Sequence, residues 1–99
     1  MAMSATTIPV DPYVLDTLMR DLIGHDRRPS AYLVYLALLG LAGEGRVALS
    51  HAQLAHRTGL SKRAVQDGVA HLVRRRLIEA KRGGVTEAAQ YRVLAPWRR

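Results

Sequence analysis

The stretch from Ser50 to Ile78 constrains the fold more than any other part of this sequence, because it signals two helices joined by a tight turn. Ser50 and Gln53 have the spacing of a capping box, in which each side chain satisfies the other residue's free backbone N–H. This spacing predicts a first helix from about His51 to Thr58. Beyond the turn, apolar side chains recur at steps of three and four, which predicts a second helix that buries Val65, Val69, Leu72 and Val73.

Three positions determine how these two helices cross. Ala55 is small at the point where the helices must approach each other closely. Gly59, four residues later, can adopt the positive φ that often follows a helix end, and Ser61 can cap the second helix. Val65, six residues after Gly59, anchors the second helix in the core. Alanine, glycine and valine at these offsets are the steric skeleton of a helix-turn-helix, whose second helix enters the major groove of DNA.

Two segments resemble a known family. The sequence LAHRTGLSKRAVQ resembles the helix-turn-helix of bacterial regulators such as the MarR and GntR families, and VAHLVRRRLIEAKRGG resembles the recognition helix, first wing strand and wing of their winged form. The resemblance extends from about Ser30 to Leu94. It implies a bacterial DNA-binding protein, most simply a transcriptional regulator, with a recognition helix at about Ser61–Leu77 and a wing at about Arg82–Ala88.

Two further helices are predicted before this motif. Asp11 and Pro12 are suited to the N-cap and first position of a helix at Tyr13–Ile23. The next helix, at about Ser30–Ala42, is apolar on every face and must therefore be covered on every face. We expect a homodimer built through these N-terminal helices, because their apolar surface exceeds what a DNA-binding unit of this size needs. The alternative is a compact monomer in which the first helix supplies the cover.

Three short segments are predicted to be strands, and they complete an α+β fold. They form a three-stranded antiparallel sheet from Arg46–Leu49, Leu77–Lys81 and Ala89–Leu94. The expected fold class is therefore mainly α with a small antiparallel sheet, a winged helix-turn-helix preceded by an extra N-terminal helix. Residues 29–99 are expected to be the winged helix-turn-helix domain, and residues 1–28 an extension for packing or dimerisation.

The basic residues are concentrated in one half of the chain. Residues 1–45 carry three arginines and five acids, a net charge of −2, whereas residues 46–99 carry twelve Lys and Arg and three acids, a net charge of +9. An ordinary solvated surface mixes both signs, and a one-sided charge is typical of a surface that binds a polyanion. We therefore expect double-stranded DNA as the partner.

The outward residues at the start of the second motif helix are predicted to contact DNA, and they are Ser61, Lys62, Arg63, Gln66 and Asp67. Arg63 suits guanine and Gln66 suits adenine, because each side chain matches the paired hydrogen-bonding groups of that base. Lys62 and Ser61 more readily hold phosphates at the helix N-terminus. Asp67, where related proteins often carry Arg, Asn or Ser, either accepts from a cytosine amino group or holds Arg63 in place one turn away.

Three other groups of basic residues bear on the interface, and Gly68 bears on how the helices pack. Arg57 is a candidate for phosphate contact, and Lys81 and Arg82 at the wing are candidates for the minor groove or the phosphates beside it. Arg74–Arg76 either stabilise the helix C-terminus or contact phosphates. Gly68 stands in mid-helix, where glycine costs about 1 kcal/mol against alanine, and a close helix crossing is one interpretation of it.

The remaining chemistry does not predict an enzyme or a metalloprotein. His51 and His56 are five residues apart and diverge around a helix, while His71 and His25 lie elsewhere, and the chain has no cysteine. There is no nucleophile–base pair at a recognisable spacing, no Gly-rich phosphate loop and no cofactor motif. We expect neither a cofactor nor a bound metal.

The sequence predicts a soluble cytoplasmic protein. The N-terminus lacks the features of a secretory signal, and the longest uncharged run, Pro29–Gly43, is too short to span a bilayer. A small-molecule effector, if there is one, must bind in the helical core or at a dimer interface. Two other functions stay open: a plasmid or phage replication or partition factor, and an adaptor that binds protein through its Tyr32–Leu41 helix.

Overall fold

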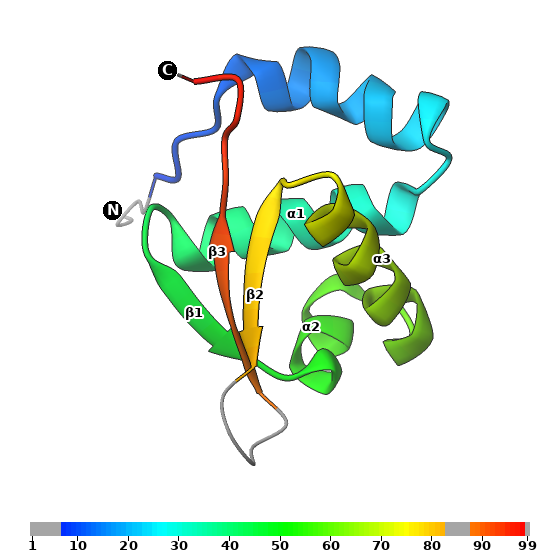
Figure 1. Ribbon diagram of the computed structural model, residues 1–99, viewed down its shortest axis with the longest axis vertical. Helices are drawn as coiled ribbons and strands as arrows, with labels where there is room; N and C mark the ends of the chain where they lie inside the picture. The colour runs from blue at the N-terminus through cyan, green and yellow to red at the C-terminus, as the bar shows by residue number, and fades with distance from the viewer. Residues whose placement is uncertain (1–6, 83–87, 99) are drawn as a thin grey trace, which may run out of the picture.

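A computed structural model describes residues 7–82 and 88–98 of the protein. The chain begins with a helix from Pro12 to His25, most of it with π-type hydrogen bonds in the segments η1 (Val14–Leu18) and η2 (Arg20–His25). The elements that follow are α1 (Pro29–Ala42), β1 (Arg46–Leu49), α2 (His51–Thr58), α3 (Lys62–Arg74), β2 (Ile78–Arg82) and β3 (Ala89–Val93) (Figure 1). This is the predicted α+β fold with one extra N-terminal helix. No helix in the described ranges has the length and apolar character needed to cross a membrane.

The three strands form one antiparallel sheet in the order β1-β3-β2. Val47 of β1 lies opposite Tyr91 of β3, and Ile78 of β2 lies opposite Val93. The bounds of β1 are those predicted, and β2 and β3 differ from their predicted ends by one residue. The predicted wing joins β2 to β3, and its residues 83–87 lie outside the described residues.

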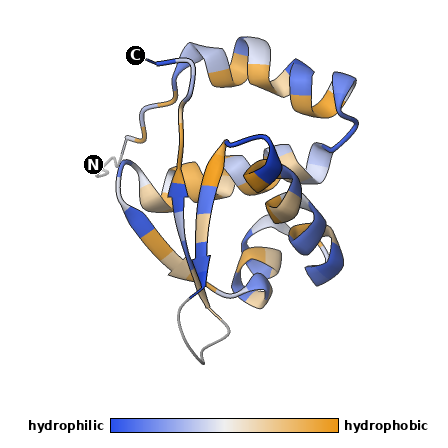
Figure 2. Cartoon of the chain, viewed as in Figure 1, coloured by the Kyte–Doolittle hydropathy of each residue, from blue (hydrophilic) through white to orange (hydrophobic). Residues whose placement is uncertain are grey.

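The core is built around α1. The side chains of Tyr35 and Leu38 are buried, and the Tyr35 hydroxyl donates to the carbonyl of Leu94 at 3.0 Å, which fixes α1 to the end of β3. Burial raises the pKa of Tyr35 to about 12. Figure 2 shows that α1 is hydrophobic along much of its length, as its sequence requires of a helix covered by its neighbours.

The N-terminal helix covers a second face of α1. The Tyr32 hydroxyl donates to the carbonyl of Val14 at 2.9 Å, and Val14, Leu18 and Leu22 are buried in the same core. Much of the apolar surface of α1 is thus covered within one chain, although Leu33 is 42% exposed. The N-terminal helix also exposes apolar surface, in a row formed by Leu15, Met19 and Ile23, and Ile8 and Val10 are exposed before it.

The C-terminal segment returns to the start of the N-terminal helix (Figure 1). Asp11 caps this helix by accepting from the Tyr13 N–H at 3.0 Å, and its other oxygen accepts from the side chains of Trp97 and Arg98, each at 3.1 Å. The Trp97 ring also stacks on Tyr13, with centroids 4.3 Å apart. The hydrogen bonds from Tyr13, Trp97 and Arg98 lower the pKa of Asp11.

The predicted C-terminal end of the recognition helix is wrong: α3 ends at Arg74 and does not continue to Leu77. Arg76 adopts a left-handed backbone with φ 58°. Its N–H donates to the carbonyl of Val73 at 3.0 Å, and the Leu77 N–H donates to the carbonyl of Leu72 at 2.9 Å. These two bonds are those of a Schellman motif, which ends the helix and turns the buried Leu77 back into the core.

α3 crosses α1 at Gly68. A methyl group on Gly68 would lie 3.2 Å from Cα of Ala31 and from the carbonyl oxygen of Ser30, so the close crossing explains a glycine in mid-helix. Val73, predicted to be buried, is 42% exposed, because eight residues of helix place it about 80° around the axis from Val65. The buried face of α3 consists of Val65, Gly68, Val69 and Leu72.

Candidate nucleic-acid interface

The caps and turn between α2 and α3 are confirmed. Ser50 Oγ accepts from the Gln53 N–H at 3.1 Å, and Gln53 Oε1 accepts from the Ser50 N–H at 2.8 Å. Gly59 ends α2 with φ 81°. Ser61 Oγ then accepts from the Ala64 N–H at 3.0 Å and caps α3. These local bonds set the direction in which α3 leaves α2.

The predicted contact residues at the start of α3 all lie on its exposed side, and they are Ser61, Lys62, Arg63, Gln66 and Asp67. Nε of Arg63 lies 3.8 Å from a carboxylate oxygen of Asp67, and the two side chains are 85% and 64% exposed. The contact corresponds to one of the two roles expected of Asp67. An exposed pair of this kind is worth only about 0.3–0.5 kcal/mol, so it restrains Arg63 weakly.

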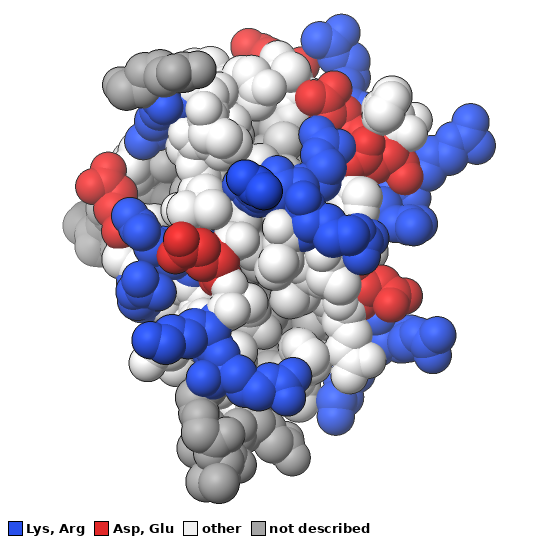
Figure 3. All heavy atoms as spheres, in the orientation of Figure 1, with Lys and Arg blue, Asp and Glu red and all other residues white. Residues whose placement is uncertain are grey.

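The other predicted contacts come from different elements. Lys81 and Arg82 are exposed at the end of β2, and Arg57 is exposed in the last turn of α2. On the sheet, Arg46 lies 3.9 Å from Glu79. Figure 3 shows Lys and Arg side chains over the lower part of the sheet and along the edge of the molecule formed by α3, with acids between them. The basic residues thus lie on several elements.

The three consecutive arginines at the end of α3 have separate roles. A guanidinium nitrogen of Arg74 lies 3.3 Å from Nδ1 of His71. Arg75 forms an ion pair with Asp26, and Arg76 occupies the left-handed position of the helix end. The three residues therefore do not act as one group, and a phosphate contact for any of them stays a prediction.

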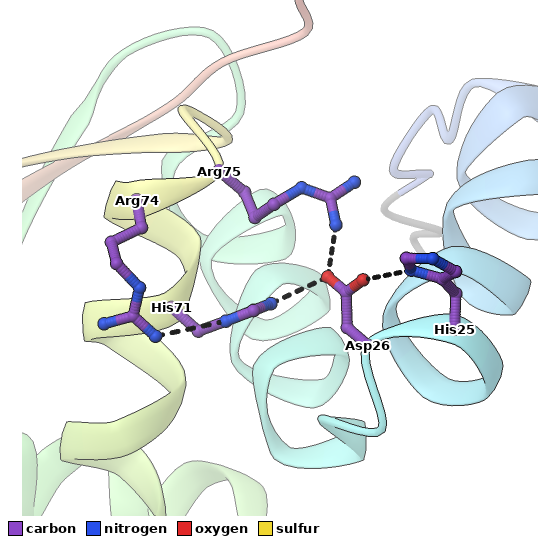
Figure 4. A network of polar contacts seen from close by, with 5 residues as sticks. All are labelled: His25, Asp26, His71, Arg74 and Arg75. Atoms are coloured by element: carbon purple, nitrogen blue, oxygen red, sulfur yellow. Dashed lines mark hydrogen bonds and ion pairs between the residues drawn. The ribbon is translucent and has the colours of Figure 1, made fainter.

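Asp26 is the centre of a polar network that joins the N-terminal helix to α3 (Figure 4). Its carboxylate is 7% exposed and accepts from Nε2 of His71 at 2.7 Å, from Nδ1 of His25 at 2.8 Å, and from Arg75. Burial of the carboxylate raises the pKa of Asp26, but the hydrogen bonds from His25 and His71 and the charge of Arg75 outweigh it and lower the pKa to about 2.

No pattern along the chain pointed to this network, because 45 residues separate Asp26 from His71. Arg27 and Arg28 likewise belong to no motif that marks them in the sequence. The structure places both of them beside α3, where they line a groove together with Arg74.

Comparisons with known proteins agree with this geometry. The sequence matches the family described as a helix-turn-helix domain over residues 28–78, just over half of the chain. No curated protein matches it. The fold is similar to the crystal structure of the AntR antimony-specific transcriptional repressor, with a TM-score of 0.51, over 94% of this chain and 75% of that chain. At 22% sequence identity, this similarity shows the fold alone. The chain belongs to the helix-turn-helix domain family, and its three-stranded sheet gives it the winged form of that fold.

Proposed function

We propose that the protein is a small transcriptional regulator that recognises a sequence in double-stranded DNA. In this proposal α3 enters the major groove, and the wing between β2 and β3 contacts the flanking backbone or the minor groove. The observation that carries the proposal is the exposed side of α3, opposite its buried face, which presents Lys62, Arg63, Gln66 and Asp67.

The contact residues divide into two groups by their chemistry. Arg63 and Gln66 have the paired hydrogen-bonding groups that read guanine and adenine in the major groove, and Asp67 can accept from cytosine. The second group contacts the backbone and carries no sequence information of its own, and it consists of Ser61, Lys62, Arg57, Lys81 and Arg82. The net charge of +9 on residues 46–99 supports this electrostatic contribution.

The experiment that tests the proposal is a binding assay with duplex DNA. A mobility shift with random duplex at two salt concentrations should show affinity that falls steeply with salt, by about 0.9 in the slope of log K against log salt for each phosphate contacted. Selection of bound sequences from a random pool should then give a preferred motif. Absence of binding in dilute salt, or binding that ignores salt, would contradict the proposal.

We also propose that the regulator is a homodimer formed through its N-terminal helix. Leu15, Met19 and Ile23 are 52%, 37% and 39% exposed and are four residues apart, so they form one apolar row that a second copy can cover. In a two-fold dimer the half-sites should lie about 10 base pairs, or a multiple, apart. Light scattering should give a dimer at tens of micromolar that Met19→Gln weakens and Leu33→Gln does not. A monomer at that concentration would argue against this assembly.

The same proposal covers the cellular setting and the division of the chain. A regulator of this family acts where the chromosome is, which in a bacterium is the cytoplasm, and it needs no catalytic activity. Residues 29–99 are proposed as the DNA-binding domain, and residues 1–28 as an extension that adds to its core and forms the contact between copies.

A further inference from the structure

A groove of about 520 Å³ lies between the start of α1 and the outer side of α3. One wall comes from Arg27, Arg28 and Ser30, and the other from Ala64, Ala70 and Arg74. The alanines leave room between the two walls. We propose that this groove binds the sugar-phosphate backbone of the DNA strand beside the recognition helix, through Arg27, Arg28 and Arg74. This inference rests on the proposed function and assigns one strand of the duplex to one surface.

The position of the groove follows from the spacing of residues on α3. Arg63, Asp67, Ala70 and Arg74 succeed one another at steps of four, three and four, so they lie on one side of the helix. Asp67, Ala70 and Arg74 also line the groove, which therefore opens onto the side of α3 proposed to face DNA. The major groove is about 12 Å wide and a helix with its side chains about 10–12 Å across, so a phosphate backbone must run close along each side of α3.

The charge of the groove fits a phosphate backbone. Three guanidinium groups line it, and the acid among the lining residues, Asp67, already lies 3.8 Å from Arg63. Within residues 7–82 and 88–98, the side chains of Arg27 and Arg28 make neither an ion pair nor a hydrogen bond. A guanidinium presents its donors in a planar fork that matches phosphate oxygens. The first turn of α1, which has no side-chain cap, adds a partial positive charge to the same wall.

The Asp26 network holds these arginines in place. Asp26, the residue before Arg27, is bound to His71 of α3 and to Arg75 at the C-cap of α3, so the linker is fixed against the recognition helix. Arg27 itself has a left-handed backbone, with φ 59°, which turns the chain into α1. Because Nε2–H of His71 donates to Asp26, its Nδ1 is left to accept from Arg74 at 3.3 Å (Figure 4). One carboxylate therefore positions both walls of the groove.

The test compares the salt dependence of DNA binding in the full chain and in three variants. Removing one phosphate-binding side chain should make the slope of log K against log salt shallower by about 0.9. Arg28→Ala should therefore show a slope shallower by about one, and Arg28→Lys, which keeps the charge, should have a slope close to that of the unaltered protein. Arg20→Ala is the matched control, because it removes an equal charge from an exposed position on the N-terminal helix. Its slope should equal that of the unaltered protein.

A second measurement needs no variant. Ethylation of single phosphates in a bound duplex should interfere with binding of the unaltered protein on both backbones that flank α3, including the one on the α1 side. If the protein binds DNA but Arg28→Ala and Arg20→Ala have equal slopes, or if ethylation on the α1 side has no effect, the groove proposal is overturned alone. If the unaltered protein does not bind duplex DNA in dilute salt, the proposed function fails together with it.

Discussion

Replacing Asp26 by asparagine tests the contact that fixes α3 against the N-terminal helix. The substitution preserves the shape of the side chain and removes its charge. The carboxylate of Asp26 is 7% exposed and accepts from His71, His25 and Arg75, whereas an asparagine amide has a single oxygen to accept with and turns an N–H toward the remaining donors.

The size of the effect follows from the pKa. Lowering the pKa of Asp26 from 3.8 to about 2 corresponds to about 2 kcal/mol of stability, at about 1.4 kcal/mol per pH unit. Loss of one partner from a fully buried ion pair costs about 3–5 kcal/mol, but His25 and Arg75 are 84% and 37% exposed and can be solvated by water. We therefore expect Asp26→Asn to lower the free energy of unfolding by about 2 kcal/mol at pH 7.

Urea unfolding followed by circular dichroism measures this destabilisation, and its pH dependence identifies the cause. The folded-state pKa of Asp26 lies below the unfolded value, so the stabilisation is present above pH 3.8 and is lost as the pH falls toward 2. The difference in the free energy of unfolding between the unaltered protein and Asp26→Asn should therefore narrow as the pH falls from 3.8 toward 2. Asp16→Asn, which alters an exposed acid on the N-terminal helix, should change stability by less than about 0.5 kcal/mol. Equal destabilisation in the two variants, or a difference that is unchanged at low pH, would refute the reasoning.

Three further substitutions test the packing. Gly24→Ala places a methyl group in open space within a helix and should raise the thermal stability by about 1 kcal/mol. Gly68→Ala should overpack α1, so this variant should be less stable than Gly24→Ala by at least about 1 kcal/mol. The opposite order of stability contradicts the close crossing of α1 and α3. Arg76→Gly should stabilise by about 1 kcal/mol in urea unfolding, because glycine adopts positive φ without strain, and a decrease in stability contradicts the left-handed helix end. Trp97→Ala should cost about 2 kcal/mol by removing the stack on Tyr13, and an unchanged unfolding midpoint contradicts that stacking.

The parts of the fold that could be predicted from the sequence are those encoded by neighbouring residues. The capping box needs only Ser50 and Gln53, and the turn needs only a glycine at position 59 and a cap at Ser61, so their geometry follows from local chemistry. The exposed side of α3 also follows locally, because the buried Val65 and Val69 determine which residues face outward.

The features that were missed depend on contacts between distant parts of the chain. The sequence shows that Gly68 should destabilise a helix, but the close approach that requires a glycine there comes from the backbone of Ala31, on another helix. The role of Asp26 depends on His71, which lies 45 residues away along the chain. No spacing along the chain contains that information.

The most direct test of the central claim, that α3 reads the DNA sequence, is the ratio of specific to random affinity in two arginine variants. Arg63→Ala should cost about 1–3 kcal/mol on the preferred site, lower that ratio, and flatten the preference at one base position in each half-site. Arg82→Ala, at the end of β2, should weaken binding to both DNAs evenly and make the salt slope shallower by about one. If Arg63→Ala leaves the ratio unchanged while Arg82→Ala abolishes it, α3 is not the element that reads the sequence.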